Sequence, residues 1–417
     1  MPRKRFSIPA VAGLVLLFAA SAWSANYEVL YHFASSRSYY PSSGLVVDAA
    51  GNAYGTTSGH NGYGGTVYEL SPTTGFHVLY AFKDPGPSGW DPRGNLIFDS
   101  AGNLYGTAAS GGSCTSTFCG VVFELSPPSS GSPGPWTETV LHTFCSQTNC
   151  ADGLLPQAGV IMDSAGNLYG TTMNGGPGAC EDGCGVVFEL TPGQGGQWTE
   201  SVLYSFMNNG DGGLPTGNLI FDGAGNLYGT TSVGSVFQLV PAGAGWTFNL
   251  LYAFNRSEGS KDGNDPQAGL VFDAAGNLYG TTAGGGEFGL GTVFELTPSL
   301  EGSWTETILH NFAGGNDGSQ PESSLIFDPS GNLDGTTFTG GGSNGCEGYT
   351  CGTVFQLIPG AGGLWTESIF RFPQNGNGGF GPTAPLLIYA GSAYGTTTTG
   401  GPFQKSYRLG VVFKLTP

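Results

Sequence analysis

One motif recurs seven times along this 417-residue chain, and the repetition constrains the fold more than any other feature. The motif is Gly-Asn-Leu-Tyr-Gly-Thr-Thr with small changes, and its copies lie 51 to 64 residues apart. They begin at Gly51, Gly102, Gly166, Gly225, Gly276, Gly331 and Gly391. Regular repetition of a unit of about this size indicates an array of one supersecondary structure, stacked on itself.

Each copy contains four runs that are typical of strands, which we label a to d in chain order. In the second copy, run a (95–99) ends at an aspartate and is followed by a Gly-Asn turn and run b (104–107). Run c (121–125) is rich in Val and Phe, and run d (136–144) alternates between apolar and polar residues. A repeated four-stranded unit with short turns is the pattern of a propeller blade.

The two ends of the repeat region predict how the array closes. The chain has a lone d-type run at 27–33, whereas its last copy stops after a c-type run at 411–415. Pairing the two would complete the last blade and remove an open sheet edge. We therefore predict an all-β, seven-bladed β-propeller as a single domain over residues 26–417, closed by pairing the N-terminal strand with the C-terminal blade. An open β-solenoid, or a propeller with another number of blades, is the alternative.

Residues 1–25 have the pattern of a secretory signal peptide. Arg3, Lys4 and Arg5 precede an apolar stretch at 8–20, and small residues follow at 20–22. An uncleaved anchor is the alternative. No later segment is apolar and long enough to cross a bilayer. We expect a mature chain without a membrane span, located outside the cytoplasm as a secreted, periplasmic or cell-surface protein.

The charge of the mature chain restricts its partners. The whole chain has 12 basic and 30 acidic residues, and removal of the three basic residues of the signal leaves 9 − 30 = −21. Such a surface repels the phosphate backbone of nucleic acids and anionic lipid. No nucleic-acid partner is expected.

The loops that join the runs differ in variability, and this points to one face. In a propeller the b–c and d–a loops share a face, and here those loops vary in length and chemistry. Binding residues tend to lie on variable loops that a rigid scaffold holds. Aromatic and cationic residues there suit an extracellular glycan or protein ligand; loop self-packing and charge balance are the competing interpretation. The candidate residues are Tyr39, Tyr40, Trp90, Phe288, Tyr349, Phe380, Tyr407 and Arg408.

Residues that recur in nearly every copy are interpreted as structural. One set is the aspartates of the a–b turn: Asp48, Asp99, Asp163, Asp222, Asp273 and Asp328. The sixth copy has Asp334 where the others have Tyr, which marks a site or reflects drift. A second motif, Asp-Gly-x-x-Pro, recurs at Asp152, Asp211, Asp262 and Asp317. It could form a ring of Ca²⁺ ligands, but it lacks a dense carboxylate run, so a turn is the favoured interpretation and no cofactor is predicted.

Eight cysteines fall in close pairs within the variable loops. An even number in an exported chain predicts disulfides that fix these loops. Cross-pairing between the first two pairs is an alternative, and metal binding is disfavoured because no His lies nearby. The pairs are Cys114/Cys119, Cys145/Cys150, Cys180/Cys184 and Cys346/Cys351.

The repeat resembles that of a known family. The string Gly-Asn-Leu-Tyr-Gly-Thr-Thr, then Gly-Thr-Val-Phe-Glu-Leu-Thr-Pro, then Trp-Thr-Glu-x-x-Leu-Tyr-x-Phe is similar to the GloVer tandem repeat (choice-of-anchor) of exported bacterial proteins. The resemblance covers nearly the whole mature chain. It implies export and repetition, but no reaction and no catalytic residues.

Three functions remain open at this point. The favoured hypothesis is a non-enzymatic propeller that binds a glycan or protein on its variable face. The first alternative is a glycosidase or lyase that uses carboxylates near the central opening; no serine-hydrolase, metalloprotease or phosphate-loop motif is present. The second alternative is a cell-surface scaffold without a small ligand.

Overall fold

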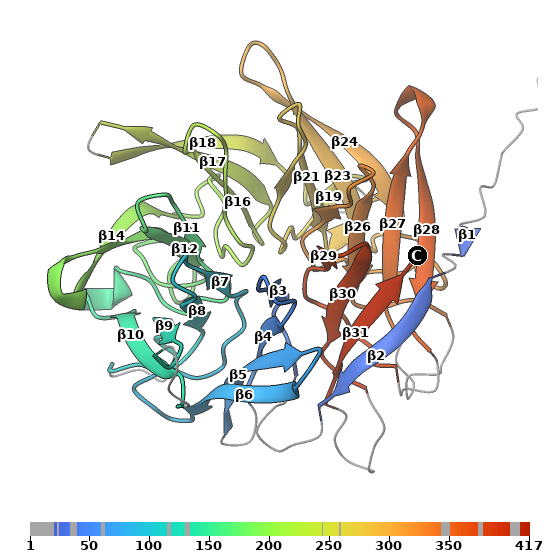
Figure 1. Ribbon diagram of the computed structural model, residues 1–417. Coiled ribbons are helices and arrows are strands. Elements are labelled where there is room, and N and C mark those ends of the chain that lie inside the picture. The colour runs from blue at the N-terminus through green and yellow to red at the C-terminus, as the bar shows by residue number, and fades with distance from the viewer. Residues whose placement is uncertain are drawn as a thin grey trace, which may run out of the picture.

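The computed structural model describes residues 21–22, 25–33, 40–59, 63–114, 118–129, 134–243, 245–257, 260–342, 351–373, 378–400 and 409–417. Within them the chain forms seven four-stranded antiparallel blades around a central axis (Figure 1). Most of the predicted signal peptide lies outside the described residues. Its short strand β1 (Ser21–Ala22) pairs in parallel with the outer strand of blade 6. None of the helical segments in the described ranges has the length and hydrophobicity that a membrane crossing requires.

Each blade follows the predicted order, with a short strand a nearest the axis and strand d outermost. Blades 1 to 3 are β3 (Val46–Val47), β4 (Ala53–Thr57), β5 (Tyr63–Ser71) and β6 (Gly75–Lys83); β7 (Ile97–Phe98), β8 (Leu104–Ala108), β9 (Val121–Ser126) and β10 (Thr137–Thr143); and β11 (Ile161–Met162), β12 (Leu168–Thr172), β13 (Val186–Pro192) and β14 (Trp198–Ser205).

Blades 4 to 6 repeat the same pattern. They are β15 (Ile220–Phe221), β16 (Leu227–Thr231), β17 (Ser235–Ala242) and β18 (Gly245–Ala253); β20 (Val271–Phe272), β21 (Leu278–Thr282), β23 (Thr292–Pro298) and β24 (Trp304–Asn311); and β25 (Ile326–Phe327), β26 (Leu333–Thr337), β27 (Thr353–Pro359) and β28 (Trp365–Arg371). A further two-stranded ladder joins β19 (Gly263–Asn264) to β22 (Gly284–Gly285) in the loops of blade 5.

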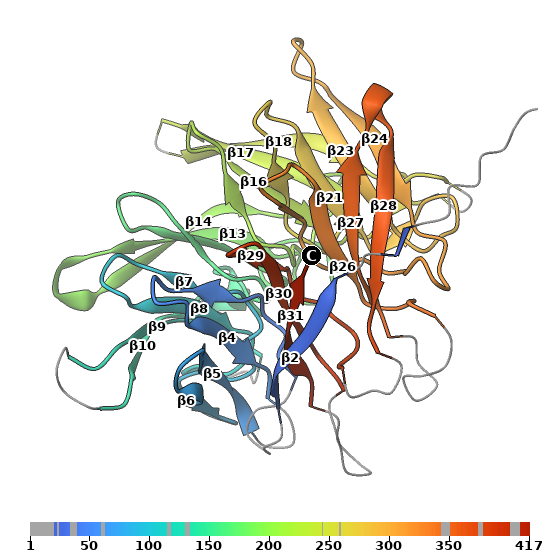
Figure 2. The same cartoon turned by 45° about the vertical axis from the view of Figure 1, so that its right-hand side comes forward.

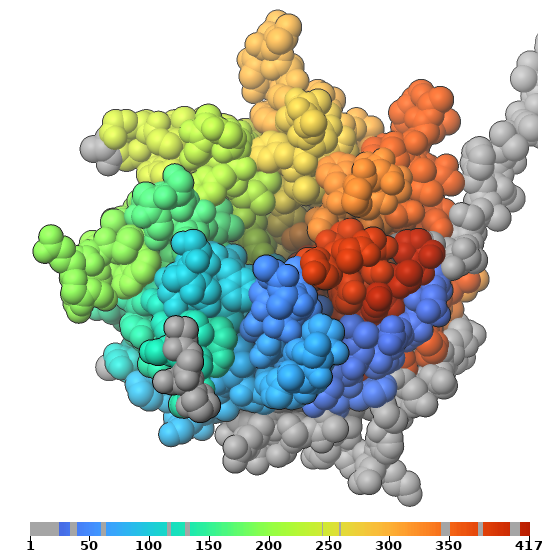
Figure 3. Space-filling model, viewed as in Figure 1, coloured from blue at the N-terminus to red at the C-terminus, as the bar shows by residue number. Residues whose placement is uncertain are grey.

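The seventh blade confirms the predicted closure. It consists of β29 (Leu387–Tyr389), β30 (Ser392–Thr397), β31 (Val411–Thr416) and the N-terminal strand β2 (Asn26–His32). Strand β2 pairs antiparallel with β31, with Asn26 opposite Thr416. Both ribbon views and the space-filling view place the blue N-terminal strand against the red C-terminal blade (Figures 1, 2 and 3). Strand β31 is therefore paired on both sides, and blade 7 has four strands like the other blades.

The hydrophobic core lies between neighbouring blades. A representative cluster combines Tyr279, Val293 and Phe312 of blade 5 with Leu325 and Phe355 of blade 6, all of which are buried. Because each blade completes its core with side chains of the next, a single blade could not bury its apolar face alone. Stacking of units is what stabilises repeat folds of this kind.

The recurring aspartate fixes the a–b turn. In blade 5, Asp273 Oδ1 accepts the N–H groups of Ala275 (2.8 Å) and Asn277 (2.9 Å), and Oδ2 accepts the amide of Asn277 (2.8 Å) and the hydroxyl of Tyr279 (3.1 Å). Burial alone would raise the pKa of Asp273, but these hydrogen bonds outweigh it and hold the pKa below its ordinary value. The turn therefore uses a charged aspartate as a structural cap.

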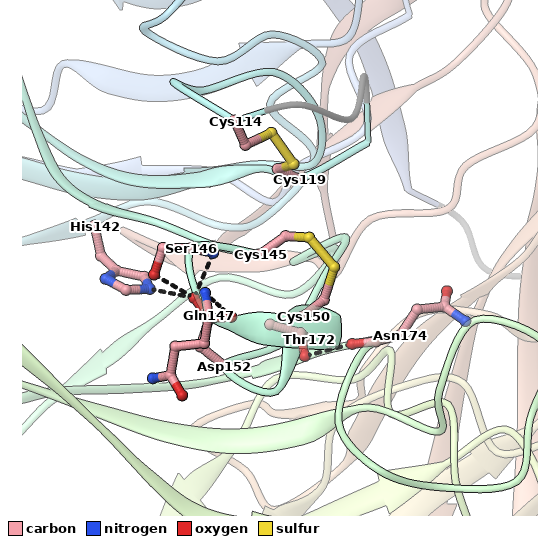
Figure 4. The surroundings of a disulfide bond; sticks show 10 residues. All are labelled: Cys114, Cys119, His142, Cys145, Ser146, Gln147, Cys150, Asp152, Thr172 and Asn174. Atoms are coloured by element: carbon pink, nitrogen blue, oxygen red, sulfur yellow. Dashed lines mark hydrogen bonds and ion pairs between the residues drawn. A yellow bond between two sulfur atoms is a disulfide. The ribbon is translucent and has the colours of Figure 1, made fainter.

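Three of the four predicted cysteine pairs are confirmed as disulfides: Cys114–Cys119, Cys145–Cys150 and Cys180–Cys184. Each closes within its own loop, so the cross-pairing alternative is wrong. Cys351 is also disulfide-bonded, and Cys346 lies outside the described residues. Figure 4 shows the first two bridges side by side in the loops of blade 2 and of the blade 2–3 junction.

Asp334 replaces the tyrosine of the other copies and is almost fully buried, with 1% of its surface exposed. Its Oδ1 accepts a hydrogen bond from the amide of Gln356 (2.9 Å). Burial raises the pKa of Asp334 to about 7; the Gln356 hydrogen bond opposes this rise and the charge of Asp328 adds to it. Because the pKa of Asp334 is higher in the folded state than in the unfolded state, the folded protein loses stability as the pH increases from about 4 to about 7.

Asp334→Asn is accordingly expected to raise stability at pH 8 by about 1 kcal/mol or more, with little effect at pH 4. Asparagine keeps the oxygen that Gln356 bonds but never has to be buried as a charge. Melting temperatures of the variant and the natural chain at the two pH values provide the measurement. An equal shift at both pH values would show that ionisation of Asp334 is not the cause.

Candidate functional site

A funnel opens at the centre of the face that carries the b–c and d–a loops. Its outer part has a cavity volume of about 600 Å³ and is lined by residues of all seven blades. Most of these lining residues lie between the proline that ends each d–a loop and the start of strand a. We call these seven residues the polar ring: Ser42, Arg93, Gln157, Thr216, Gln267, Glu322 and Thr383. The aromatic side chains of Tyr40 and Phe338 also line the opening.

Below the polar ring the funnel narrows onto apolar residues of the a strands. This inner part, about 330 Å³, is lined mainly by aliphatic side chains, among them Leu96, Leu219 and Leu325, which are buried. Charged residues are absent from its described lining. The site is thus a polar mouth above an apolar floor. That arrangement can hold a small polar ligand with an apolar face.

A left-handed backbone residue before each loop proline positions the polar ring. The φ angles are Tyr40 49°, Asp91 63°, Leu155 57°, Leu214 56°, Asp265 58°, Gln320 55° and Gly381 67°. This conformation is unfavourable for residues other than glycine. In blade 3 it is held by two hydrogen bonds: the Leu155 N–H donates to the carbonyl of Cys119 in the preceding blade (3.2 Å), and its carbonyl accepts from Met173 N–H (3.0 Å).

The disulfides stabilise the same inter-blade joints. The carbonyls of Cys119, Cys184 and Cys351 accept the N–H groups of Leu155, Leu214 and Gly381, respectively, at the start of the next blade. Each of these cysteines is disulfide-bonded. The bridges therefore fix the loop ends that hold the pre-proline residues, and through them the polar ring two residues later in the chain.

Hydrogen bonds orient the charged and amide groups of the polar ring. Arg93 Nε donates to Asp91 Oδ2 (2.8 Å), and Gln267 Nε2 donates to Asp265 Oδ2 (2.9 Å). Burial, and then the negative charge of Asp265, raise the pKa of Glu322. Among the described residues of the lining, Glu322 carries the only carboxylate and Arg93 the only permanent positive charge.

Among the aromatic and cationic candidates that the structure describes, Tyr40 alone lines the funnel. Trp90 pairs with Ser110 through its backbone and packs against the core of blades 1 and 2. Phe380 pairs in the same way with Thr399 and packs between blades 6 and 7, whereas Phe288 is 55% exposed on a loop of blade 5. The other candidates lie outside the described residues: Tyr39, Tyr349, Tyr407 and Arg408.

The sequence reasoning missed the polar ring and Phe338. A signal existed, because the residue after each loop proline changes from copy to copy, Arg93 in one and Gln157 or Glu322 in others, within a frame that otherwise repeats. The Asp-Gly-x-x-Pro aspartates close their own loops, as when Asp211 accepts the N–H groups of Met207 (2.9 Å) and Asn209 (3.2 Å). Such bonds favour the turn interpretation of this motif.

Known proteins similar to this chain identify the family of its repeat but not a ligand. No curated protein matches the sequence. One solved structure, a candidate oxidoreductase (glucose dehydrogenase) from Thermus thermophilus, is similar with 15% identity and a TM-score of 0.40, covering 94% of this chain and 99% of that one. Two stretches, residues 12–235 and 232–417, match the repeat described as the Gloeobacter/Verrucomicrobia repeat. Because these stretches span nearly the whole chain, the protein belongs to the Gloeobacter/Verrucomicrobia repeat family.

Proposed function

We propose that this protein is an exported, non-enzymatic propeller that binds a glycan in the funnel. The supporting observation is the polar ring, in which seven blades each contribute one side chain, of five residue types, to a shared concave mouth. Amide, hydroxyl, carboxyl and guanidinium groups together can donate to and accept from the hydroxyl groups of a sugar. Tyr40 and Phe338 supply the aromatic surfaces on which the apolar face of a sugar ring packs.

A glycan suits the funnel better than a folded protein partner does. A cavity of about 600 Å³ is in the size range of small-ligand pockets, and it is concave and mainly polar at its mouth. Stable protein partners instead use broad surfaces of roughly 800 Å² per side with an apolar centre. The negative charge of the chain also favours a neutral or weakly charged ligand.

Binding is favoured over hydrolysis by the acid content of the lining. Glycosidases generally need two carboxyl groups that flank the scissile bond. In the described lining Glu322 stands as a single carboxylate, although its raised pKa would suit a general acid. A funnel enzyme therefore remains the second candidate, and release of product from an oligosaccharide would be its signature.

Export is part of the proposal. Three disulfides form within the described loops, and disulfides persist in oxidising compartments outside the cytoplasm. The repeat family supports the same location. Processing of residues 1–25 would be visible as the N-terminal sequence of the secreted protein.

The test is a glycan array with the chain from residue 26 onward, followed by calorimetry on the best ligand. We expect Gln157→Leu to weaken binding about tenfold, because one or two hydrogen bonds in the polar ring are lost. The matched control is Gln194→Leu, the same change on an exposed turn between strands c and d of the same blade, on the opposite face. Equal affinities for the two variants would contradict a funnel site. Sugar release by the natural chain that stops in Glu322→Gln would replace the binding proposal with the enzymatic one.

A further inference from the structure

The outer rim contains seven equivalent contacts, one at each blade junction. A residue of strand d in one blade faces a residue of strand d in the next. Three junctions are aromatic stacks with these ring-centroid distances: Tyr31–Phe76 4.0 Å, Tyr204–Phe248 4.4 Å and Tyr27–Phe370 5.1 Å. The other four have a glutamate from the following blade next to Tyr80, His142, Tyr252 or His310. The same junction position is thus aromatic at three junctions and ionisable at four.

The junction of blades 5 and 6 gathers three metal-ligating side chains. His310 lies on β24, Asp317 on the d–a loop that follows it, and Glu367 on β28. Their ligand atoms all lie within 4.8 Å of one another. His310 Nε2 is 3.3 Å from Asp317 Oδ1 and 3.5 Å from Glu367 Oε1. Three different segments of the fold therefore converge on one small volume.

These distances suit a shared ion better than direct hydrogen bonds. Hydrogen bonds from ring nitrogen to oxygen are usually about 2.7–3.2 Å long. Among the described residues, neither His310 Nε2 nor Glu367 Oε1 has a hydrogen-bond partner, although both atoms are buried. In a tetrahedral zinc site with bonds of about 2.0–2.1 Å, neighbouring ligand atoms are about 3.3–3.4 Å apart. The two separations from His310 Nε2 are therefore close to the edges of such a tetrahedron.

Burial adds an independent reason for a cation. The Glu367 side chain is only 6% exposed, and a buried carboxylate without a counter-charge is costly. The nearby Arg371 donates instead to the carbonyl of Asn316 (3.1 Å). His310 and Asp317 are each 19% exposed, which leaves an open side for an ion to enter.

The loop that carries Asp317 leaves one carboxylate oxygen for the cluster. Asp317 Oδ2 accepts the N–H of Ala313 (2.5 Å), and its Oδ1 is the atom nearest to His310. The backbone N–H of Asp317 donates to the carbonyl of Gly314 (3.0 Å), which fixes the turn. The ligand is thus oriented by its own loop before any ion binds.

We propose that His310, Asp317 and Glu367 form a binding site for a divalent transition-metal ion, with Zn²⁺ the best match, that links blades 5 and 6 at the rim. One nitrogen and two carboxylate oxygens are a ligand set that zinc accepts. Water would complete the coordination from the exposed side. Because the ligands come from two blades, the bound ion stabilises their junction and raises the melting temperature.

The junction of blades 2 and 3 offers a matched control within the same chain. It has the same residue types, His142, Asp152 and Glu200, at equivalent positions. There, however, Asp152 Oδ2 already accepts the N–H (2.9 Å) and the hydroxyl (2.7 Å) of Ser146, and Oδ1 accepts the N–H of Gln147 (3.2 Å), as Figure 4 shows. With its carboxylate occupied by its own loop, this junction is expected not to bind the ion.

The test measures zinc binding to the full secreted chain after chelator treatment. We expect one Zn²⁺ per chain by competition with a colorimetric chelator, a higher melting temperature with zinc than without, and visible absorption typical of tetrahedral Co²⁺ when cobalt replaces zinc. His310→Phe, which copies the phenylalanine of the next junction, should lower zinc affinity at least tenfold. Glu367→Gln should do the same at nearly unchanged volume, and His142→Phe should not.

Two results would overturn the metal site. One is an unchanged melting temperature and no bound zinc in the natural chain at micromolar concentrations of the ion, which would leave the three residues as a proton-sharing cluster. The other is a zinc affinity that does not depend on this cluster, which would place the ion elsewhere. It would be seen as an equal loss of zinc in His142→Phe and His310→Phe, or as zinc binding that survives both Glu367→Gln and His310→Phe. Melting temperatures of all variants in chelator confirm that each one folds.

Discussion

Deletion of residues 25–33 is expected to abolish cooperative folding of the whole ring. The deletion removes β2, so β31 becomes an open edge and blade 7 keeps only three strands. It also removes Tyr27 and Val29, which pack against buried residues of blade 7, and Phe33, which is buried against blade 1. Loss of a single buried aromatic side chain costs about 3–5 kcal/mol. The combined loss approaches the whole stability of a typical domain, about 5–15 kcal/mol.

Urea unfolding followed by circular dichroism and by tryptophan fluorescence measures this loss. The control is a circular permutant that begins at Tyr40 and carries residues 25–33 after Pro417, joined by Asn-Gly. Because Asn26 lies opposite Thr416, the junction becomes a tight c–d hairpin like that of blade 4, where Ala242 pairs with Gly245. The permutant is expected to regain a cooperative transition. A deletion that unfolds at the same urea concentration as the natural chain would contradict closure by β2.

The fold could be predicted because seven copies of one motif can be compared with one another within a single sequence. Seven copies of one motif gave the number of blades, and the recurring Asp and Gly of the a–b turn marked where strands a and b meet. The ends of the chain carried the remaining information, since a spare d strand at 27–33 and a missing one after 415 imply pairing across the ring. Each of these inferences depends on local patterns or on counting, which one sequence supplies.

The site could be placed only in part. The variable face was predicted from loop length, and the funnel lies there, but its lining comes from seven loops that meet only around the axis. Candidates chosen for their aromatic character, such as Trp90 and Phe380, pack against the cores between neighbouring blades. The residues that meet at the mouth, such as Gln157 and Thr216, are ordinary surface types. Their significance arises from position, which a linear sequence does not display.

The same limit applies to the rim. His310 and Glu367 are 57 positions apart in the chain, and they face each other because consecutive blades stack with equivalent residues side by side. The sequence does show His in the slot that most copies fill with Tyr. It does not show that this slot faces the Glu of the next Trp-Thr-Glu. Such a contact can be identified only when the geometry of the ring is known. The seven junctions can then be compared with one another.

The Gly of the Tyr-Gly-Thr motif has a steric role that predicts large losses of stability on substitution. In blade 5, Gly280 on β21 lies opposite Phe294 on β23, and Phe294 is fully buried. A Cβ atom at Gly280 would lie 2.6 Å from Phe294 Cζ and 3.0 Å from Leu270 Cδ2. The ring of Phe294 therefore occupies the space that the missing side chain leaves free. The same pairing of Gly and Phe recurs in blade 3, at Gly170 and Phe188.

Phe294→Ala is expected to lower the free energy of unfolding by about 3–5 kcal/mol, because it opens a cavity in the core between blades 4 and 5. Gly280→Ala should cost about 1–3 kcal/mol through overpacking. The two sites should also be coupled: in Gly280→Ala/Phe294→Leu the loss should be smaller than the sum of the losses of Gly280→Ala and Phe294→Leu by about 1 kcal/mol or more. Urea unfolding of the four chains, namely the natural one, both single variants and the double variant, measures this coupling.

Gly276→Ala separates steric from backbone effects. Gly276 lies in the a–b turn with φ +89°, and an added Cβ would meet no atom within 4 Å. Alanine there should cost about 1–2 kcal/mol through its backbone conformation alone. That loss should add to the loss of Phe294→Leu without coupling, because the turn does not contact the ring. If the losses of Gly280→Ala and Phe294→Leu were also additive, the steric explanation would be wrong. The repeat would then require the motif glycine for its backbone conformation and not to leave space for the phenylalanine of strand c.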